Sequence, residues 1–154
     1  MATQPAQPTT QPGQAETLQA DLDRVIRVAA GALRAPIVAV ALAGAPEPRL
    51  LASAGAPPGW HKLLAACRAG CAPDEVLVIE QLRASDLPAG LAALAGQAGA
   101  LLELPLVGAG GALLGYLSLA DRAPRMWQPA ELQQAEDLAG LAASTIELCR
   151  EAQI

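Results

Sequence analysis

The sequence is nearly devoid of aromatic side chains, with no Phe, one Tyr and two Trp among its 154 residues. A core must therefore be built from Leu, Ala, Val and Ile, and a hydrophobic content of 53% is enough to build one. Positive charge is also scarce: ten Lys plus Arg give a net charge of −5 and form no basic run. Because nucleic-acid binding needs clustered cations to neutralise phosphates, the sequence argues against DNA or RNA as a partner.

No stretch approaches the roughly 20 consecutive apolar residues of a membrane span. The N-terminus also lacks the basic region and apolar run of a signal peptide. We therefore expect a cytoplasmic protein without a membrane partner. The three cysteines, Cys67, Cys71 and Cys149, form no CxxC pair, which favours reduced thiols that pack as small hydrophobes. The single histidine, His61, lies near the start of a predicted helix and is interpreted as a surface or capping residue, so no metal or cofactor is expected.

The first fifteen residues consist of Gln, Pro, Thr, Ala and Gly after the initial Met, with no charged side chain. They show no apolar periodicity, so burial cannot offset the entropy lost on ordering. We predict a disordered tail over 1–15 and one folded domain over 16–154.

Hydrophobic periodicity and turn residues divide the rest of the chain into helices and strands. Two connections are short enough for hairpins, which favours a mostly antiparallel sheet and an α+β fold. The strand over 113–120 is apolar on both faces and should lie centrally with material above and below it. The predicted elements are strands over 37–42, 49–54, 76–80, 101–107 and 113–120, and helices over 18–33, 60–68, 88–95 and 131–151.

The last forty residues carry the most specific pattern in the chain. A strand with Gly-Tyr-Leu-Ser-Leu over 115–119 is followed by the corner Asp-Arg-Ala-Pro-Arg-Met-Trp over 121–127. An acidic helix start at Glu131 and Leu-Ala-Gly-Leu-Ala over 138–142 complete it. This arrangement resembles the close of a GAF domain, and the resemblance extends over about 18–148. It implies an antiparallel sheet of about five strands with the first and last helices on one face. The short helices and a ligand pocket are then implied on the other face.

The sequence departs from the specialised branches of that family. Phytochrome-type members attach a bilin through a cysteine closely followed by histidine, whereas here His61 precedes Cys67. The cyclic-nucleotide signature of the phosphodiesterase type contains Phe, which this chain lacks. The resemblance thus implies a non-catalytic bacterial module for signal transduction, which signals through its terminal helices. Its expected partners are a small-molecule ligand that it binds or a downstream signalling protein. Three alternatives stay open: a structural dimerisation domain without ligand, a methionine sulfoxide reductase of the GAF type, and a thiol redox sensor.

Polar residues in apolar strands mark the candidate pocket. Glu103 interrupts the predicted fourth strand and Ser118 lies within the fifth. Burying an unpaired charge is unfavourable, which leaves two interpretations of Glu103. It is either solvated or salt-bridged at the edge or rim of the sheet, or it is a polar side chain that lines a pocket. Glu80 and Gln81 follow the third strand at a corner, where we place the pocket mouth. The ligand-pocket candidates are Glu80, Gln81, Glu103 and Ser118, and no catalytic or metal-binding residue is predicted.

The terminal helix carries two apolar stripes, one through Leu138, Leu141, Thr145 and Leu148, the other through Ala135, Ala139, Ala142, Ile146 and Cys149. One stripe suffices to cover a sheet, so a second predicts a helix–helix seam and a homodimer. Alternatively, the two terminal helices satisfy each other within one subunit. The sequence does not assign which stripe faces the sheet. The interface candidates are Ala135, Leu138, Ala139, Leu141, Ala142, Ile146 and Leu148.

Overall fold

The computed structural model describes residues 12–44 and 47–151. Its centre is a five-stranded antiparallel sheet of order β2-β1-β5-β4-β3. The strands are β1 (Ile37–Leu42), β2 (Arg49–Ala54), β3 (Leu77–Ile79), β4 (Ala100–Val107) and β5 (Leu113–Asp121). The helices are α1 (Pro12–Leu33), α2 (Trp60–Arg68), α3 (Pro129–Glu151) and two 3₁₀ segments, η1 (Ala84–Asp86) and η2 (Ala89–Gly96). The predicted α+β class and the antiparallel sheet are confirmed.

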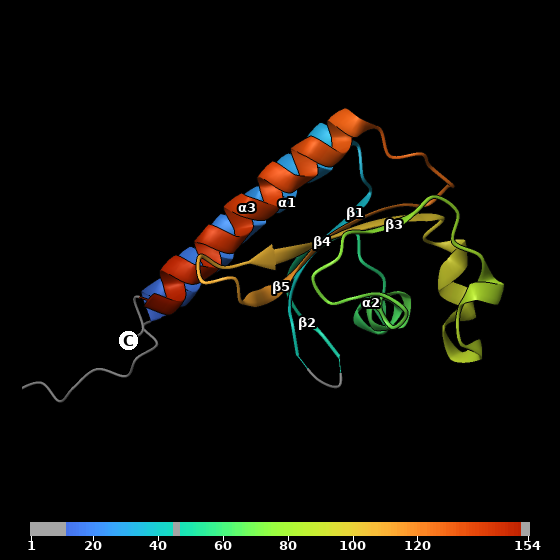
Figure 1. Cartoon of the computed structure of the whole chain (residues 1–154), viewed down its shortest axis with the longest axis horizontal. Coiled ribbons are helices and arrows are strands. Elements are labelled where there is room, and N and C mark those ends of the chain that lie inside the picture. Colours follow the sequence, from blue (N-terminus) through green and yellow to red (C-terminus); the bar gives the residue numbers. More distant parts are fainter. Residues whose placement is uncertain (1–11, 45–46, 152–154) are drawn as a thin grey trace, which may run out of the picture.

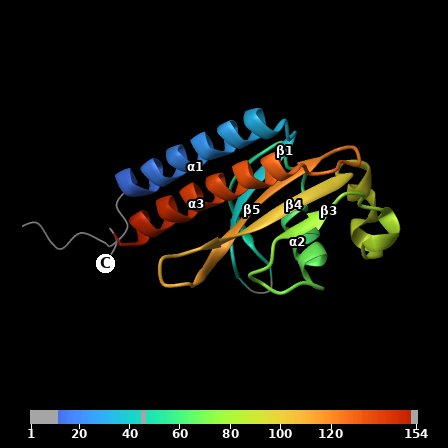
Figure 2. The same ribbon diagram turned by 45° about the horizontal axis from the view of Figure 1, so that its top comes forward.

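Helices cover both faces of the sheet. Figures 1 and 2 show α1 and α3 lying side by side along one face, while α2 lies on the other. Successive strand residues point to opposite faces, so β4 sends Leu102, Leu104 and Leu106 towards the terminal helices. Its residue Leu101 joins the second core, which includes Trp60 and the other buried residues beneath α2. This division is the one that the resemblance implied, and it leaves β5 central and covered on both sides.

Several boundaries differ from prediction by one or two residues, and the helix predicted over 88–95 is the 3₁₀ segment η2. Three larger differences concern α1, β3 and the segment after β3. Helix α1 begins at Pro12, so residues 12–15 belong to a helix and not to the predicted tail; proline suits the first turn because it needs no N–H partner there. Residues 1–11 of that tail lie outside the described residues. Strand β3 keeps only three residues, because it pairs with β4 only from Leu101 to Glu103. The predicted loop over 81–86 contains the 3₁₀ turn η1.

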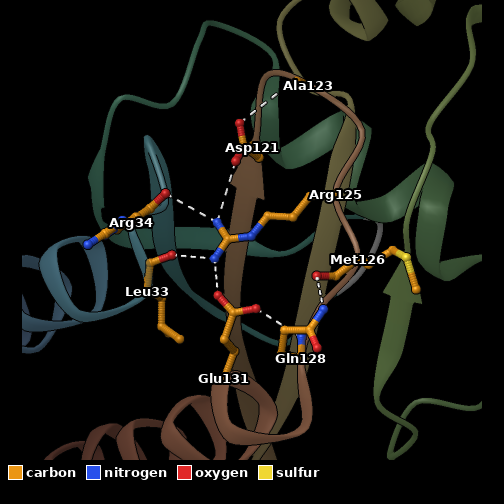
Figure 3. A network of polar contacts seen from close by, with 8 residues as sticks. All are labelled: Leu33, Arg34, Asp121, Ala123, Arg125, Met126, Gln128 and Glu131. Carbon is orange, nitrogen blue, oxygen red and sulfur yellow. Dashed lines mark hydrogen bonds and ion pairs between the residues drawn. The ribbon is translucent and has the colours of Figure 1, made fainter.

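The corner after β5 is held by one side chain, Arg125, which Figure 3 shows at the centre of a polar network. Its guanidinium donates to the carbonyl oxygens of Leu33 and Arg34, where α1 ends. Arg34 closes that helix in the left-handed conformation, with φ of 51°. A helix C-terminus leaves carbonyls without intrahelical partners, and a cation there satisfies them. Arg125 therefore caps α1 from a segment about ninety residues later in the chain.

The same guanidinium also binds the strand and the last helix. It contacts the Asp121 carboxylate at 3.4 Å, pairs with Glu131 in the first turn of α3, and lies 4.3 Å from the ring centroid of Trp127. Glu131 accepts a further hydrogen bond from the Gln128 N–H. Burial alone would raise the pKa of Glu131, but the Gln128 N–H and the Arg125 cation outweigh it and lower that pKa. We call Arg125, Asp121 and Glu131 the corner clamp.

Candidate functional site

A cavity of about 220 Å³ opens on the α2 side of the sheet. Its wall is made by the last two turns of α2, by the ends of β1 and β2, and by the middle of β4 and β5. Most of this lining is apolar, with three polar side chains among it. The lining residues are Ala43, Gly44, Pro48, Leu64, Ala65, Arg68, Ala69, Glu103 and Tyr116. A volume of this size holds a compact molecule, at the small end of ligand cavities.

An ion pair forms the polar end of the cavity. Glu103 is a buried β4 residue whose side chain is 2% exposed, and Arg68 in the last turn of α2 is 12% exposed. Arg68 Nε donates to Glu103 Oε1 at 2.8 Å, and Nη2 lies 2.7 Å from the same oxygen. The second contact is an ion-pair contact without hydrogen-bond geometry, since Nη2 has no hydrogen-bond partner among the described residues. Burial raises the pKa of Glu103, although the Arg68 cation opposes that rise.

Arg68 also fastens the loop that follows α2. Its Nη1 donates to the carbonyl oxygens of Ala72 and Glu75, and its guanidinium lies 4.5 Å from the Tyr116 ring centroid. The Tyr116 hydroxyl donates to the Pro73 carbonyl at 2.8 Å, so the strand holds the loop as well. Arg68 thus joins three elements around the cavity: the end of α2, its following loop and the floor formed by β4 and β5.

The structure separates the four predicted pocket residues into two pairs. Glu103 and Ser118 are directly opposite each other on β4 and β5, and both are buried at 1% exposure. Glu103 lines the cavity, whereas the Ser118 hydroxyl contacts the Ala39 carbonyl at 3.4 Å. Glu80 and Gln81 are exposed and are not part of this lining. They lie beyond β3, where the Glu80 carbonyl accepts a hydrogen bond from the Arg125 N–H of the corner.

Sequence reasoning missed the two residues that complete the polar end. Arg68 ends a predicted helix, but two further segments and the third strand separate it from Glu103, so no local pattern identifies it as the cation that a buried glutamate needs. The sequence places Tyr116 in a predicted strand without indicating a role. Strand alternation could have identified it, because Tyr116 lies two residues before Ser118 and therefore on the same face of the sheet.

The Cys67 thiol near the cavity is not activated. Cys67 lies on α2, half-buried, and its pKa is raised to about 11, chiefly by burial and further by the Glu103 and Asp86 carboxylates. A nucleophilic cysteine needs a depressed pKa, because the thiolate is the reactive form. Among the described residues, no group of three or more His, Cys, Asp or Glu side chains is placed to hold a metal ion.

This thiol is expected to be inert at neutral pH. Relative to the ordinary value of 9.0, a pKa of about 11 leaves roughly a hundredfold less thiolate, so alkylation should slow by about that factor. Timed labelling of the whole chain with iodoacetamide at pH 7, read by peptide mass spectrometry against a small free thiol, measures this rate. Labelling of Cys67 as fast as the free thiol would contradict the assignment.

The two stripes of α3 have different environments. Ala135, Ala139, Ala142 and Ile146 are buried against the sheet and α1 at 5% exposure or less. These four interface candidates are already packed in the subunit's own core, so they cannot form a seam with a second copy. Leu141 and Leu148 are instead 55% and 66% exposed, beside half-buried Leu138. With 51% exposed Val28 of α1, Leu138 and Leu141 line a shallow groove between the two helices on the outer face.

An antiparallel sheet has paired terminal helices on one face and, on the other, a small cavity beside α2, which together define a compact α+β domain. The sequence matches the GAF domain family over residues 17–146. The chain therefore belongs to the GAF domain family, as the C-terminal motif suggested. A search of curated proteins gave no match.

Solved structures of GAF domains share this fold. The blue-light absorbing form of the PixJ GAF domain from Thermosynechococcus elongatus superposes with a TM-score of 0.69 at 18% identity, over 92% of this chain and 91% of that one. A GAF domain/HD domain protein from Geobacter sulfurreducens gives 0.68 at 17% identity, over 92% and 99%. A domain assigned to a two-component sensor histidine kinase of Sinorhizobium meliloti gives 0.66 at 20% identity, over 84% and 91%.

Among the described residues, no helix combines the length and the apolar character needed to cross a membrane.

Proposed function

We propose that this GAF domain is a non-catalytic sensory or regulatory module that binds a small molecule in the cavity beside α2 and responds through α1 and α3. The observation that carries the proposal is the cavity itself, because its floor belongs to the two strands that also contact the terminal helices. The similar structures include one named as a cyanobacteriochrome receptor and a domain named as part of a two-component sensor histidine kinase. Burial raises the pKa of Cys67, which disfavours this thiol as the nucleophile of the reductase alternative.

A direct connection runs from the cavity strands to the end of α3. The hairpin between β4 and β5 reaches α3, where the Ala109 N–H donates to both carboxylate oxygens of Glu147 at 2.9 and 3.0 Å. Gly108 permits this approach, because a Cβ there would lie 2.6 Å from Glu147 Oε2. A shift of Glu103 or Tyr116 on binding would displace the same hairpin. We propose that this tether carries a displacement of the floor to the last turns of α3.

Filling the cavity tests its role. Ala65→Trp places a large side chain in the lining, whereas Lys62→Trp adds the same side chain at an exposed position of the same helix. In a thermal-shift screen of small molecules, we expect compounds that stabilise the wild type and the Lys62 variant but not the Ala65 variant. Stabilisation that survives Ala65→Trp would place binding elsewhere and contradict the proposed site.

We further propose a homodimer formed by the outer groove of α1 and α3. Exposed apolar side chains on two adjacent helices are typical of a protein interface. Val28 and Leu141 line the groove together, and Leu148 is exposed two turns further along α3. This surface also favours the second candidate function, a dimerisation domain whose cavity holds no ligand. The proposed module is cytoplasmic and bacterial, and its output partner is a protein that reads the paired helices.

Charging this surface should separate the subunits. Leu141→Glu introduces a carboxylate at an interface centre, where its desolvation is unfavourable, so the dissociation constant should rise by at least about a hundredfold. The matched control is Gln133→Glu, an exposed position of the same helix outside the groove. Analytical ultracentrifugation with circular dichroism measures assembly and fold together. A wild type that stays monomeric at high micromolar concentration would refute the dimer.

A further inference from the structure

The ion pair in the cavity uses only half of the Glu103 carboxylate. Arginine commonly pairs with a carboxylate through two parallel N–H bonds to its two oxygens. Here Nε and Nη2 both approach Oε1, and Nη1 is turned away to the loop carbonyls of Ala72 and Glu75. Within the described part of the chain, no hydrogen bond reaches Oε2. Arg68 therefore leaves one oxygen of a buried carboxylate without a donor.

That oxygen is not fully enclosed, although the Glu103 side chain as a whole is only 2% exposed. The fully enclosed side-chain polar atoms that lack a partner within the described ranges are Nε1 of Trp60, Nη2 of Arg68 and Nε1 of Trp127. Oε2 of Glu103 is not among these atoms, so it is not sealed from the cavity that Glu103 lines. The accessible polar atom at this end of the cavity is thus an acceptor, whereas the unused donor Nη2 of Arg68 is enclosed and out of reach.

The other polar side chain of the lining offers no competing donor. The Tyr116 hydroxyl proton is committed to the Pro73 carbonyl, and Arg68 covers one face of its ring. The other side chains of the lining, among them Leu64, Ala65 and Pro48, are apolar. A ligand must therefore combine a compact apolar body with a group that satisfies an acceptor.

We infer that the cavity selects a small, largely apolar molecule that presents a hydrogen-bond donor, such as an N–H group, to Glu103 Oε2, and that it rejects a carboxylate or phosphate of the same size. This inference rests on the proposed function, since it names the chemical class of ligand for the same cavity. An anion would bring negative charge against a buried carboxylate whose cation is already engaged, which is unfavourable in a poorly solvated site. An amide, amine or amidine supplies the missing donor.

Four probes of nearly equal size separate these possibilities. Benzamide and benzamidine present N–H donors, benzoate presents a carboxylate, and toluene presents neither. Titration into the whole chain, followed by protein NMR, should show benzamide or benzamidine binding at the cavity at least about tenfold more tightly than benzoate and toluene, the contribution of one hydrogen bond to a charged group. Comparing the two donors shows whether a neutral or a cationic group is preferred.

Two variants assign the selectivity to Glu103. Glu103→Gln replaces one carboxylate oxygen by an amide nitrogen and should reduce the preference for donors to about twofold or less, whereas Ser118→Ala changes the buried neighbour on β5 and should retain it. The probe comparison on the wild type remains decisive if the Glu103 variant does not fold.

Benzoate binding as tightly as benzamide, or selectivity that survives Glu103→Gln, would overturn the inference. Toluene binding as tightly as benzamide would also overturn it, while leaving the proposed small-molecule site intact. If none of the four probes binds at the cavity at millimolar concentration, the inference and the proposed function both fail.

Discussion

Replacing Arg125 by Ala is expected to lower the free energy of unfolding by about 2–4 kcal/mol, because the corner clamp loses its cation while both carboxylates remain. Arg125 is 14% exposed, and its partners Asp121 and Glu131 are 29% and 24% exposed. This partial solvation places the expected loss below that of a fully buried pair. The loss of contacts at the α1 end also predicts increased amide hydrogen exchange around Leu33 and Arg34.

Chemical denaturation of the wild type, Arg125→Ala and Arg125→Lys measures this effect. Lysine keeps the charge but lacks the planar fork, so it should restore less than half of the loss. The pH dependence supplies a second test. Because the pKa of Glu131 is lowered in the folded state, its contribution is present above the ordinary glutamate pKa and is lost as pH falls through the lowered value. Equal stability of wild type and Arg125→Ala at pH 7 would contradict the clamp.

Replacing Arg68 by Met should cost about 3–5 kcal/mol at neutral pH, because it leaves the Glu103 carboxylate buried without a cation. The double variant Arg68→Met/Glu103→Leu should recover most of this loss, since an apolar pair of similar volume needs no charge compensation. The loop carbonyls of Ala72 and Glu75 belong to exposed residues, so water can replace Arg68 there. Urea denaturation of both variants and of Glu103→Leu alone gives the coupling between the two positions.

The sign of the pH effect distinguishes a buried charge from lost packing. The pKa of Glu103 is raised by burial, and Arg68 opposes that rise. In Arg68→Met the pKa should rise further. The variant should therefore be most stable below the ordinary glutamate pKa and lose stability as pH rises through the raised value. If the free energy of unfolding of Arg68→Met lies below that of the wild type by the same amount between pH 4 and pH 8, Arg68 acts through packing and not through its charge.

Local signals in the sequence define most of the fold. Turn residues and apolar runs predict β1, β2 and α2 at the residues where the structure places them. The Asp-Arg-Ala-Pro-Arg-Met-Trp corner predicts the end of β5, although nothing local indicates that Arg125 also caps α1. The helical start at Pro12 was missed because its composition is that of a tail, whereas proline is tolerated in a first helical turn.

The candidate site was less predictable, because its geometry depends on contacts between distant residues. Glu103 was recognised as a polar point in an apolar strand, but its partner Arg68 lies 35 residues earlier and becomes a neighbour only through packing of α2 on the sheet. Glu80 and Gln81 were placed at the pocket by proximity to a strand end, yet the chain there turns towards the corner clamp. The orientation of the α3 stripes likewise depends on α1. The buried alanines of α3, Ala135, Ala139 and Ala142, share a hydrophobic core with the apolar face of α1.

Native mass spectrometry of the protein tests the central claim, that the cavity beside α2 is a small-molecule site. The measurement is made on the isolated chain and again after incubation with a small-molecule extract of cells. The account predicts a defined additional mass that is released on denaturation, present in the wild type and Lys62→Trp, and absent from Ala65→Trp, which fills the cavity. Bare protein under both conditions, or an additional mass that Ala65→Trp retains, would contradict it.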